Sequence, residues 1–275
     1  MILLIDGDFL PWVVSYNCRE ASYDYEIEQM VDSIISGLIE KSGATEVVGY
    51  LGLPGLQSFR AGIATQRPYK GKRGEKPDYF EQWAGVVCQY LRNKYNFQVA
   101  EAVSWEAFAY ETDDMITSYA AALRSQNIPH VICSTDKDLK QIPGTHLNPT
   151  KMEFLEVSFE MAQRSLWKQA LTGDSTDNIM GIPKCGPKGA EKILGIEHES
   201  ESESAGEITF YSSEAHNVKQ QSVVEYPYRS LQAYIDHYGE LDGIKYFSEN
   251  YQLVKLVETI SVVLGQGYQL DATTL

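Results

Sequence analysis

The chain begins MILLIDGDFL (residues 1–10), in which an apolar run, ILLI, leads directly to Asp6. A short apolar run that ends in an acid is typical of a buried parallel strand. The further predicted strands are VVGYL (47–51), FQVAEA (97–102) and VIC (131–133). The predicted helices, from apolar residues at helical spacing, cover 25–41, 79–95 and 111–123. Strands that alternate with helices predict an α/β fold with a mostly parallel central sheet flanked by helices.

The pattern changes after about residue 158, where helices and Gly-rich turns replace the strands. The predicted elements there are a helix at 158–171, two turns flanked by helical pieces at 173–194, and helical spacing over 229–263. The polar residues 197–226 predict a disordered acidic segment with a hairpin. We therefore expect an α/β domain at 1–157 and a helical domain at 158–275 that contains this insert.

Composition narrows the classes of protein that fit. With 275 residues, 43% of them hydrophobic, the chain can bury a sizeable core. No run approaches the ~20 apolar residues of a transmembrane helix. The start lacks a basic leader, so we expect a cytoplasmic protein with no membrane partner, in the host cytoplasm if it is phage-encoded. The cysteines show no C-x-x-C spacing and the histidines no ligand spacing, which argues against zinc sites and disulfides.

Charge is distributed unevenly along the chain. The formal net charge of −15 by itself argues against a nucleic-acid ligand, because phosphates attract basic surfaces. Residues 60–76 (RAGIATQRPYKGKRGEK), here called the basic strip, nevertheless concentrate Lys and Arg, with Glu75 as their one acid. We interpret the basic strip as part of a mobile loop or arch, within 60–95, whose cations are compatible with local phosphate binding. The alternative is a merely solvated loop.

Acidic residues recur where predicted elements end or begin. Asp6 closes the first strand, and Asp136 and Asp138 follow a later one. Loops at the carboxyl ends of strands in an open α/β sheet converge on one crevice, so these side chains should face the same space. The remaining acids are Glu111, Asp113 and Asp114 at the start of a predicted helix, and Asp174 and Asp177 in a Gly-rich turn.

So many converging carboxylates require compensating cations. Two unit charges about 4 Å apart repel by roughly 4 kcal/mol at an effective dielectric near 20. Hard oxygen ligands select Mg²⁺ or Mn²⁺ rather than zinc, and two such ions about 4 Å apart can clamp the attacking and leaving oxygens of a phosphodiester. Each acid alone also has a structural interpretation, as a strand end, a first-turn helix acid or a turn former. The combined set in this order favours a metal site.

Five motifs, taken in order, resemble the 5′-nuclease family of phages and bacteria, which comprises 5′–3′ exonucleases and flap endonucleases. They are IDGDFL, SFR…RPYKGKR, ETDD, STDKDL and GDSTDNIMGIPKCGPKGA. The likeness covers roughly residues 1–195, and GD-x-x-DNI-x-G is its most specific motif. The resemblance implies a PIN-like nuclease domain followed by a helical helix-hairpin-helix subdomain that binds DNA. The short tail and the insert are more similar to phage replication exonucleases than to polymerase-fused versions.

The resemblance also implies a set of metal ligands. The residues that match the holders of the first divalent ion are Asp6, Glu111, Asp113 and Asp114. Those that match the second ion's group are Asp136, Asp138, Asp174 and Asp177. Of these, Asp136 is also assigned a catalytic role. Two divalent ions, Mg²⁺ or Mn²⁺, are the expected cofactors.

The DNA-contacting residues implied by the resemblance lie in the basic strip and after Asp177. Lys70 and Arg73 match residues that reach the reacting phosphate and are expected to be catalytic, and Tyr69 matches a position that can stack beside a terminal base. The full expected set is Arg60, Arg67, Tyr69, Lys70, Lys72, Arg73, Lys184, Gly186 and Lys188. The hairpin after Asp177 implies main-chain contacts to duplex DNA and a bound K⁺.

Two departures from the family pattern matter. The family places an Asp near the position of Leu53, but no acid occurs between Val47 and Arg60. The first metal site therefore lacks one ligand or outer acceptor, for which Asp8 could compensate unless Asp8 is a helix cap. The hairpin normally reads Gly-x-Gly, whereas this chain has Lys184-Cys185-Gly186, which puts the K⁺ geometry in question.

These features predict a 5′–3′ exonuclease with flap endonuclease activity that hydrolyses phosphodiesters near 5′ ends of duplex DNA or RNA–DNA hybrids. We expect a monomer that acts with replication proteins in phage DNA replication or primer removal. One alternative is a junction-binding module whose catalysis the change at Leu53 has weakened. Another is a PIN-type ribonuclease, although such an enzyme does not need the Gly-rich duplex-binding element.

Overall fold

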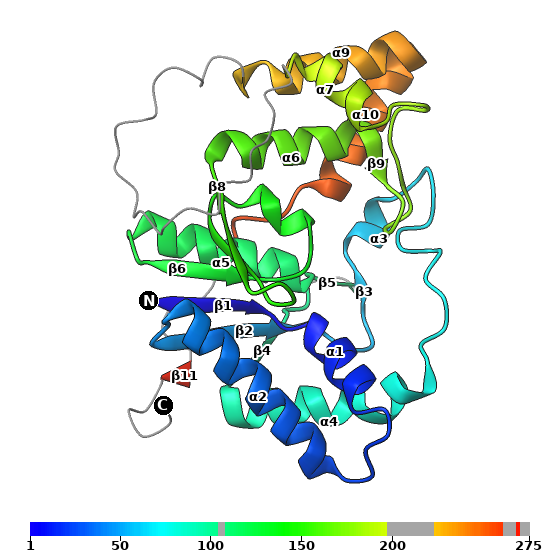
Figure 1. Cartoon of the computed structure of the whole chain (residues 1–275). Helices are drawn as coiled ribbons and strands as arrows, with labels where there is room; N and C mark the ends of the chain where they lie inside the picture. The colour runs from blue at the N-terminus through cyan, green and yellow to red at the C-terminus, as the bar shows by residue number, and fades with distance from the viewer. Residues whose placement is uncertain (104–107, 197–222, 261–267, 270–275) are drawn as a thin grey trace. The chain divides into compact units, whose positions relative to one another are not determined.

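The computed structural model describes residues 1–103, 108–196, 223–260 and 268–269, and the chain divides into two compact units (Figure 1). The first unit comprises residues 1–58, 74–156 and 256–275, and the second comprises 59–73 and 157–255. Most of the basic strip thus belongs with the helical part of the chain. The domain division expected from the sequence stays a prediction, because compactness does not show which segments fold independently.

A mostly parallel sheet forms the centre of the first unit. Strand β1 (Ile2–Asp6) pairs in parallel with β2 (Glu46–Leu51) and β6 (His130–Cys133), and β6 pairs in parallel with β7 (Gly144–Asn148). The strand order is β11-β2-β1-β6-β7-β8, with β4 (Gln98–Val99) also on β2, β8 at Glu153–Val157 and β11 at Tyr268–Gln269. Figure 1 shows helices on both faces of this sheet. The expected α/β fold is therefore confirmed.

Alternate residues of β1 enter two different cores, as the pleat of a strand requires. Leu3 and Ile5 pack with the helices of one face, and Ile2 and Leu4 pack with the other face. The helices of the first face are α1 (Phe9–Asn17), α2 (Asp24–Ser42) and α4 (Asp78–Tyr95); the second face is covered by α5 (Thr112–Ser125) and the 3₁₀ turn η1 (Asp138–Gln141). Burial on both faces explains why ILLI is continuously apolar.

The second unit is a helical assembly with one short hairpin. Its elements are α3 (Arg60–Ile63), α6 (Phe159–Thr172), β9 (Gly173–Asp174), β10 (Ile179–Met180), α7 (Pro187–Leu194), α9 (Tyr226–Tyr238) and α10 (Glu240–Val254). Trp167 of α6 stacks on Tyr251 of α10 at 5.0 Å between ring centroids. The buried Tyr234 hydroxyl donates to the Ala170 carbonyl oxygen at 2.6 Å. Aromatic packing thus fixes three helices against one another.

The hairpin β9–β10 explains the two glycines that bracket the most specific motif. Gly173 has φ +71°, a left-handed conformation that glycine adopts without steric cost. A Cβ on Gly173 would lie 2.3 Å from the Gly181 nitrogen, and a Cβ on Gly181 would lie 2.3 Å from the Gly173 nitrogen. The motif therefore needs both glycines because its two ends touch backbone to backbone.

Several elements differ from the sequence predictions. Helix α1 and strands β7 and β8 were not predicted, and β4 is shorter than FQVAEA. The helical stretch predicted at 229–263 is two helices, since Gly239 (φ 82°) interrupts it. The hairpin predicted within 197–226 falls mainly on residues outside the described part. None of the described helices combines the length and the apolar character needed to cross a membrane.

Candidate functional site

Asp6 ends β1 inside the first unit and is 5% exposed. The Ser134 hydroxyl donates to Asp6 Oδ2 at 2.7 Å, and the Asp8 N–H donates to Asp6 Oδ1 at 3.1 Å. Burial raises the pKa of Asp6 to about 7, and the negative charge of Asp8 adds to this rise, which the Ser134 hydrogen bond partly offsets. Asp6 is therefore oriented by two donors yet costly to ionise without a cation.

Asp113 lies at the start of α5, and the pKa of its carboxyl group responds to the other acids around it. Its pKa is raised well above the ordinary value, first by burial of the carboxyl group and then by nearby acids. Those acids, from the largest effect to the smallest, are Asp6, Asp136, Glu111 and Asp114. The structure thus gathers five predicted metal ligands in the first unit, here called the acid group: Asp6, Glu111, Asp113, Asp114 and Asp136.

Two members of the acid group also cap α5. Glu111 and Asp114 form a reciprocal capping box in which each side chain accepts a backbone N–H of the other residue. Asp114 is 0% exposed, and its second oxygen accepts the Val257 N–H at 2.9 Å. Both Asp114 oxygens are therefore engaged with backbone, which fixes the helix start. Metal ligation by Asp114 stays a prediction.

The loop after β6 is ordered by a relay of short hydrogen bonds. Ser134 Oγ accepts the Asp136 N–H at 2.8 Å, and Asp136 Oδ1 accepts the Asp138 N–H at 2.8 Å. The Ser134 hydroxyl thereby connects Asp6 to the loop that carries Asp136. Ser134 was not among the predicted site residues, although it lies directly between a strand and two acids in the sequence.

The oxygen donors of the acid group are of the kind that binds a divalent cation. The positions of their side chains are less suitable. The negative charges of four acids act on the Asp113 carboxyl, and hard oxygen donors are those that Mg²⁺ and Mn²⁺ prefer. As the side chains stand, however, the described residues contain no group of three or more His, Cys, Asp or Glu placed to hold a metal ion. Binding of a cation would therefore require the carboxylates to converge further.

Three predicted ligands lie outside the acid group: Asp138 in the first unit, and Asp174 and Asp177 in the second. Asp174 is buried, and its oxygens accept the Thr176 N–H at 2.7 Å and the Gln169 Nε2–H at 3.1 Å. Asp177 Oδ2 accepts the Tyr69 hydroxyl at 2.9 Å, and its Oδ1 lies 3.5 Å from the Arg73 guanidinium and 4.0 Å from Lys70 Nζ. That these two acids join the acid group in one pocket stays a prediction.

The basic strip up to Lys70 is hydrogen-bonded to α10 and to the hairpin β9–β10. Glu249 accepts the N–H groups of Thr65 and Gln66 at 2.8 and 2.9 Å. The Lys70 N–H donates to the Asp177 carbonyl oxygen at 2.8 Å. Because these bonds lie within the second unit, they hold Tyr69, Lys70 and Arg73 beside Asp177. Mobility of the strip stays a prediction.

Arg60 differs from the other cations of the strip because it is 2% exposed. Its guanidinium donates to the carbonyl oxygens of Leu253 and Lys255, each at 2.9 Å, at the carboxyl end of α10. A cation there also opposes the negative end of the helix dipole. The structure gives no support to the predicted DNA contact by Arg60, since its charge serves the interior of the second unit.

Three other predicted DNA contacts line one hollow of about 250 Å³ in the second unit. They are Arg67, Lys72 and Lys184, beside the backbone of residues 178–183. Lys184, which stands where the family pattern has glycine, has φ 65°, a left-handed conformation that favours glycine. Gly186 precedes α7 as its N-cap, and Lys188 lies in the first turn of α7.

An exposed aromatic surface in the first unit was not predicted. Trp12 and Tyr16 of α1 are 44% and 54% exposed. The Trp12 ring packs on Phe80 at 4.0 Å, and the Arg19 guanidinium lies 4.7 Å from the Tyr16 ring centre. Phe80 is buried and supports the Trp12 ring. The missed signal was the spacing of four between Trp12 and Tyr16, which places them on one helix face.

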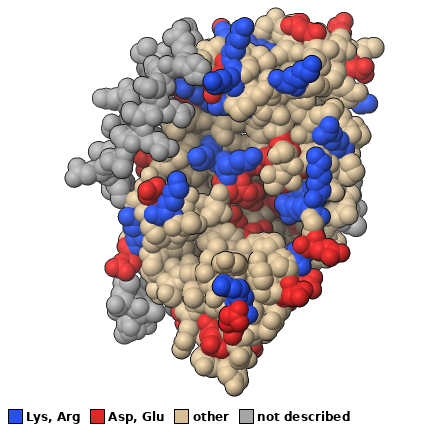
Figure 2. Space-filling view, turned by 45° about the vertical axis from the view of Figure 1, so that its right-hand side comes forward, with Lys and Arg blue, Asp and Glu red and all other residues tan. Residues whose placement is uncertain are grey.

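Surface charge is less one-sided than the net charge of −15 suggests. Figure 2 shows Lys and Arg side chains interspersed with Asp and Glu on the visible face. The chain therefore offers local basic surfaces to an anionic ligand, although long-range attraction is weak.

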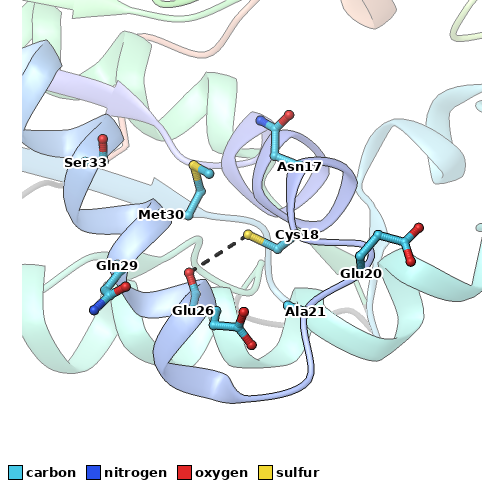
Figure 3. A pocket seen from close by; sticks show the side chains of 8 residues that line it. All are labelled: Asn17, Cys18, Glu20, Ala21, Glu26, Gln29, Met30 and Ser33. Atoms are coloured by element: carbon cyan, nitrogen blue, oxygen red, sulfur yellow. Dashed lines mark hydrogen bonds between the residues drawn. The ribbon is translucent and has the colours of Figure 1, made fainter.

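Another hollow, of about 450 Å³, lies between the end of α1 and the start of α2 (Figure 3). The Cys18 thiol in it donates to the Glu26 carbonyl oxygen at 3.9 Å. Burial raises the pKa of this thiol, and the charge of Glu26 raises it further. Cys18 is therefore held as a protonated thiol and is not an activated nucleophile.

Comparison with known sequences gives one family and a group of relatives. The model of the family "5′-3′ exonuclease, N-terminal resolvase-like domain" matches residues 2–168. DNA polymerase I of Rhizobium leguminosarum is 30% identical over 135 residues, which are 46% of this chain and 13% of the relative. A 5′-3′ exonuclease of Mycoplasma pneumoniae is 31% identical over 140 residues, 46% of this chain and 46% of the relative. The matches thus span less than half the length of these relatives.

Comparison with solved structures shows a shared fold. The bacteriophage T5 D15 protein co-crystallised with metal ions superposes with a TM-score of 0.54 at 16% identity, over 92% of this chain and 99% of that one. The T5 D15 flap endonuclease in a pseudo-enzyme-product complex with DNA and metal ions gives a TM-score of 0.53 at 16% identity, over 92% and 98%.

Proposed function

Because the chain belongs to the 5′–3′ exonuclease family, whose N-terminal resolvase-like domain matches its residues 2–168, we propose that it is a metal-dependent 5′–3′ exonuclease with flap endonuclease activity. Its substrates are the 5′ ends of duplex DNA and RNA–DNA hybrids, in which it hydrolyses phosphodiester bonds. The observation that carries the proposal is the acid group, in which four acids raise the pKa of the Asp113 carboxyl through their negative charge. A nuclease of this family needs such a group to hold cations beside a phosphate.

The acid group supplies the electrostatic reason for a cation requirement. The acids that raise the pKa of Asp113 repel one another when ionised, and burial weakens the screening by water. Two divalent ions, Mg²⁺ or Mn²⁺, would supply Lewis-acid activation and charge neutralisation at the phosphate when bound. Asp6, Glu111, Asp113 and Asp136 are the side chains that we assign to hold them. Asp138, Asp174 and Asp177 are assigned to the second ion's surroundings.

The cations of the second unit are assigned to the substrate. Arg73 is in contact with Asp177 but largely exposed, so its guanidinium can turn to a phosphate, and Lys70 lies beside it. We assign these two residues to the reacting phosphate, where they stabilise developing negative charge. Tyr69 is bound through its hydroxyl to Asp177, which leaves its ring as a stacking surface.

The hollow lined by Arg67, Lys72 and Lys184 is assigned to the phosphates of the duplex. Gly186 and Lys188 extend this surface onto the first turn of α7, whose free N–H groups and dipole also favour an anion. A K⁺ ion at this hairpin is part of the proposal. Trp12 and Tyr16 are assigned to unpaired bases at a 5′ end, because exposed aromatic rings stack on any base.

The names of the relatives support a role in DNA replication. DNA polymerase I relatives carry the matching segment within longer chains, and the T5 D15 flap endonuclease of similar fold was solved with DNA and metal ions. We propose that this chain acts as a monomer with replication proteins in primer removal or phage DNA replication. Its location is then the cytoplasm, that of the host if a phage encodes it.

Substitution of Asp136 tests the proposal directly. We expect Asp136→Ala to lower Mg²⁺-dependent cleavage of a 5′-labelled flap by at least about 100-fold, because removal of a metal-supporting carboxylate costs this much. Glu40→Gln, at an exposed carboxylate of α2, is the matched control and should cleave like the wild type. Unchanged cleavage by Asp136→Ala would falsify the proposal.

The same assay separates the two alternatives. Binding of the flap in Ca²⁺ without cleavage by the wild-type chain in Mg²⁺ or Mn²⁺ would favour a junction-binding module. Faster cleavage of single-stranded RNA than of duplex DNA ends would favour a PIN-type ribonuclease.

A further inference from the structure

Asp8 connects three segments that lie far apart in the sequence. Its Oδ1 accepts the Gly52 N–H at 2.8 Å, 44 residues away. Its Oδ2 accepts the Thr112 hydroxyl at 2.8 Å, 104 residues away. Its own N–H donates to Asp6 Oδ1 at 3.1 Å. One residue therefore joins the end of β1, the end of β2 and the start of α5.

Each of the three segments bears on the acid group. Asp6 belongs to the first segment, and Thr112 lies between Glu111 and Asp113 in the third. Gly52 follows the last residue of β2 and precedes Leu53, where the sequence lacks an expected acid. The distance between Asp6 and Asp113 thus depends on a bridge that Asp8 provides.

Neither of the two roles that the sequence suggested for Asp8 matches its contacts. Asp8 occupies the N-cap position of α1, but its side chain makes no capping hydrogen bond. Both of its oxygens instead accept donors from other segments of the first unit. Charge-assisted hydrogen bonds of this kind are about twice as strong as neutral ones, so the bridge is a firm one.

We propose that Asp8 is a positioning residue that holds Asp6 and the Glu111–Asp113 segment at the separation which cation binding requires. It acts through Gly52 and Thr112 and does not touch the cation. This inference rests on the proposed function, because it assigns Asp8 a role in the same site. Outer partners of metal ligands commonly change metal affinity by 10–100-fold when they are removed.

The comparison of Asp8→Asn with Asp8→Ala separates positioning from ligation. An Asn side chain keeps an oxygen for the Gly52 N–H and gains an amide that can donate to the Thr112 hydroxyl oxygen. We expect Asp8→Ala to weaken Mn²⁺ binding, measured by titration calorimetry, by about 10–100-fold. Asp8→Asn should recover most of that loss. Equal damage in the two variants would show that Asp8 acts through its charge rather than through the bridge, and would overturn the proposal.

Thr112 gives an independent second arm. Thr112→Val removes the hydroxyl at nearly constant volume, and we expect a loss of Mn²⁺ affinity that Thr112→Ser restores. In the double variant of Asp8→Ala and Thr112→Val the losses should be less than additive, because both changes break the same bond. The comparison of Thr112→Val with Thr112→Ser tests the bridge even if Asp8→Ala does not fold. Full additivity of the two losses would count against the bridge.

Asp32 supplies the matched control for a merely structural bridge. It accepts hydrogen bonds from the Tyr90 and Tyr95 hydroxyls at 3.0 and 2.8 Å and from Lys94 at 2.7 Å, and so joins α2 to α4. We expect Asp32→Ala to lower Tm without changing Mn²⁺ affinity. If Asp8→Ala behaves in the same way, the positioning role is refuted. A wild-type chain that neither binds Mn²⁺ nor cleaves flaps would refute the proposed function itself, together with this role.

Discussion

Asp113 in the first unit and Asp177 in the second are both expected metal ligands, but their surroundings are opposite. Asp113 is desolvated, and the charges that act on it most strongly are other acids. Asp177 instead lies against the Tyr69 hydroxyl, Arg73 and Lys70. The second unit therefore supplies its own counter-charge, whereas the acid group depends on cations from solution. In the metal-free chain, removal of the Asp113 charge should therefore raise stability, whereas removal of the Asp177 charge should lower it.

Asp113→Asn should have the largest effect. We expect cleavage to fall by at least about 100-fold, while the metal-free variant unfolds at a higher temperature than the wild type at pH 8, because one repelling charge is gone. Asp177→Asn should lower Tm instead, since its partners lose an acceptor. Thermal unfolding in EDTA measures both, and a lower Tm for Asp113→Asn would contradict the comparison.

The pH dependence of the metal-free chain tests the same contrast. The folded-state pKa of Asp6 is raised from 3.8 to about 7, so the folded state binds this proton more tightly than the unfolded state. Ionisation of Asp6 therefore costs the folded state no stability below about pH 4. The cost grows as pH rises towards about 7 and is complete above it. We expect the wild-type Tm in EDTA to increase as pH falls from 8 towards 5, and Mg²⁺ to reduce this dependence. A Tm that is flat over this range would remove the electrostatic basis of the acid group.

Arg60 and Arg73 of the basic strip should differ in their effects on stability and on cleavage, and these effects should be smaller than those above. Arg60→Ala should lower the free energy of unfolding by about 3 kcal/mol, because it leaves buried carbonyl oxygens without their donor. Arg73→Ala should change stability by less than about 1 kcal/mol, because its ion pair is exposed, yet it should slow cleavage. Urea unfolding and the flap assay distinguish the two. The reverse pattern would show that the burial of Arg60 does not matter to the fold.

Lys184→Gly should have the smallest effect. Relief of the left-handed backbone (φ 65°) should stabilise the second unit by up to about 1 kcal/mol. Loss of the charge should weaken DNA binding and reduce the slope of log affinity against log salt by about 1. A salt titration of binding measures this slope. An unchanged slope would place Lys184 away from the phosphates.

The sequence predicted the secondary structure best where the pattern was long or buried on both faces. ILLI matched β1, and the helices at 25–41 and 79–95 were recovered nearly in full as α2 and α4. Helix α1 was missed because FLPWVVSYN (9–17) contains a proline and has exposed aromatic residues. Strands β7 and β8 were missed because GTHLN and EFLEV lack a clear alternation.

For the site, the sequence by itself determined which acids end β1, begin α5 and follow β6, because strand ends in a parallel sheet must face one edge. Only the tertiary structure decided what each side chain does there. In the folded chain Asp114 accepts backbone N–H groups, and Arg60 donates to carbonyl oxygens at the end of α10. Asp8 accepts hydrogen bonds from Gly52 and Thr112. Spacing along a chain encodes local periodicity, whereas a partner 44 or 104 residues away is selected by the packing of whole elements, which local periodicity does not specify.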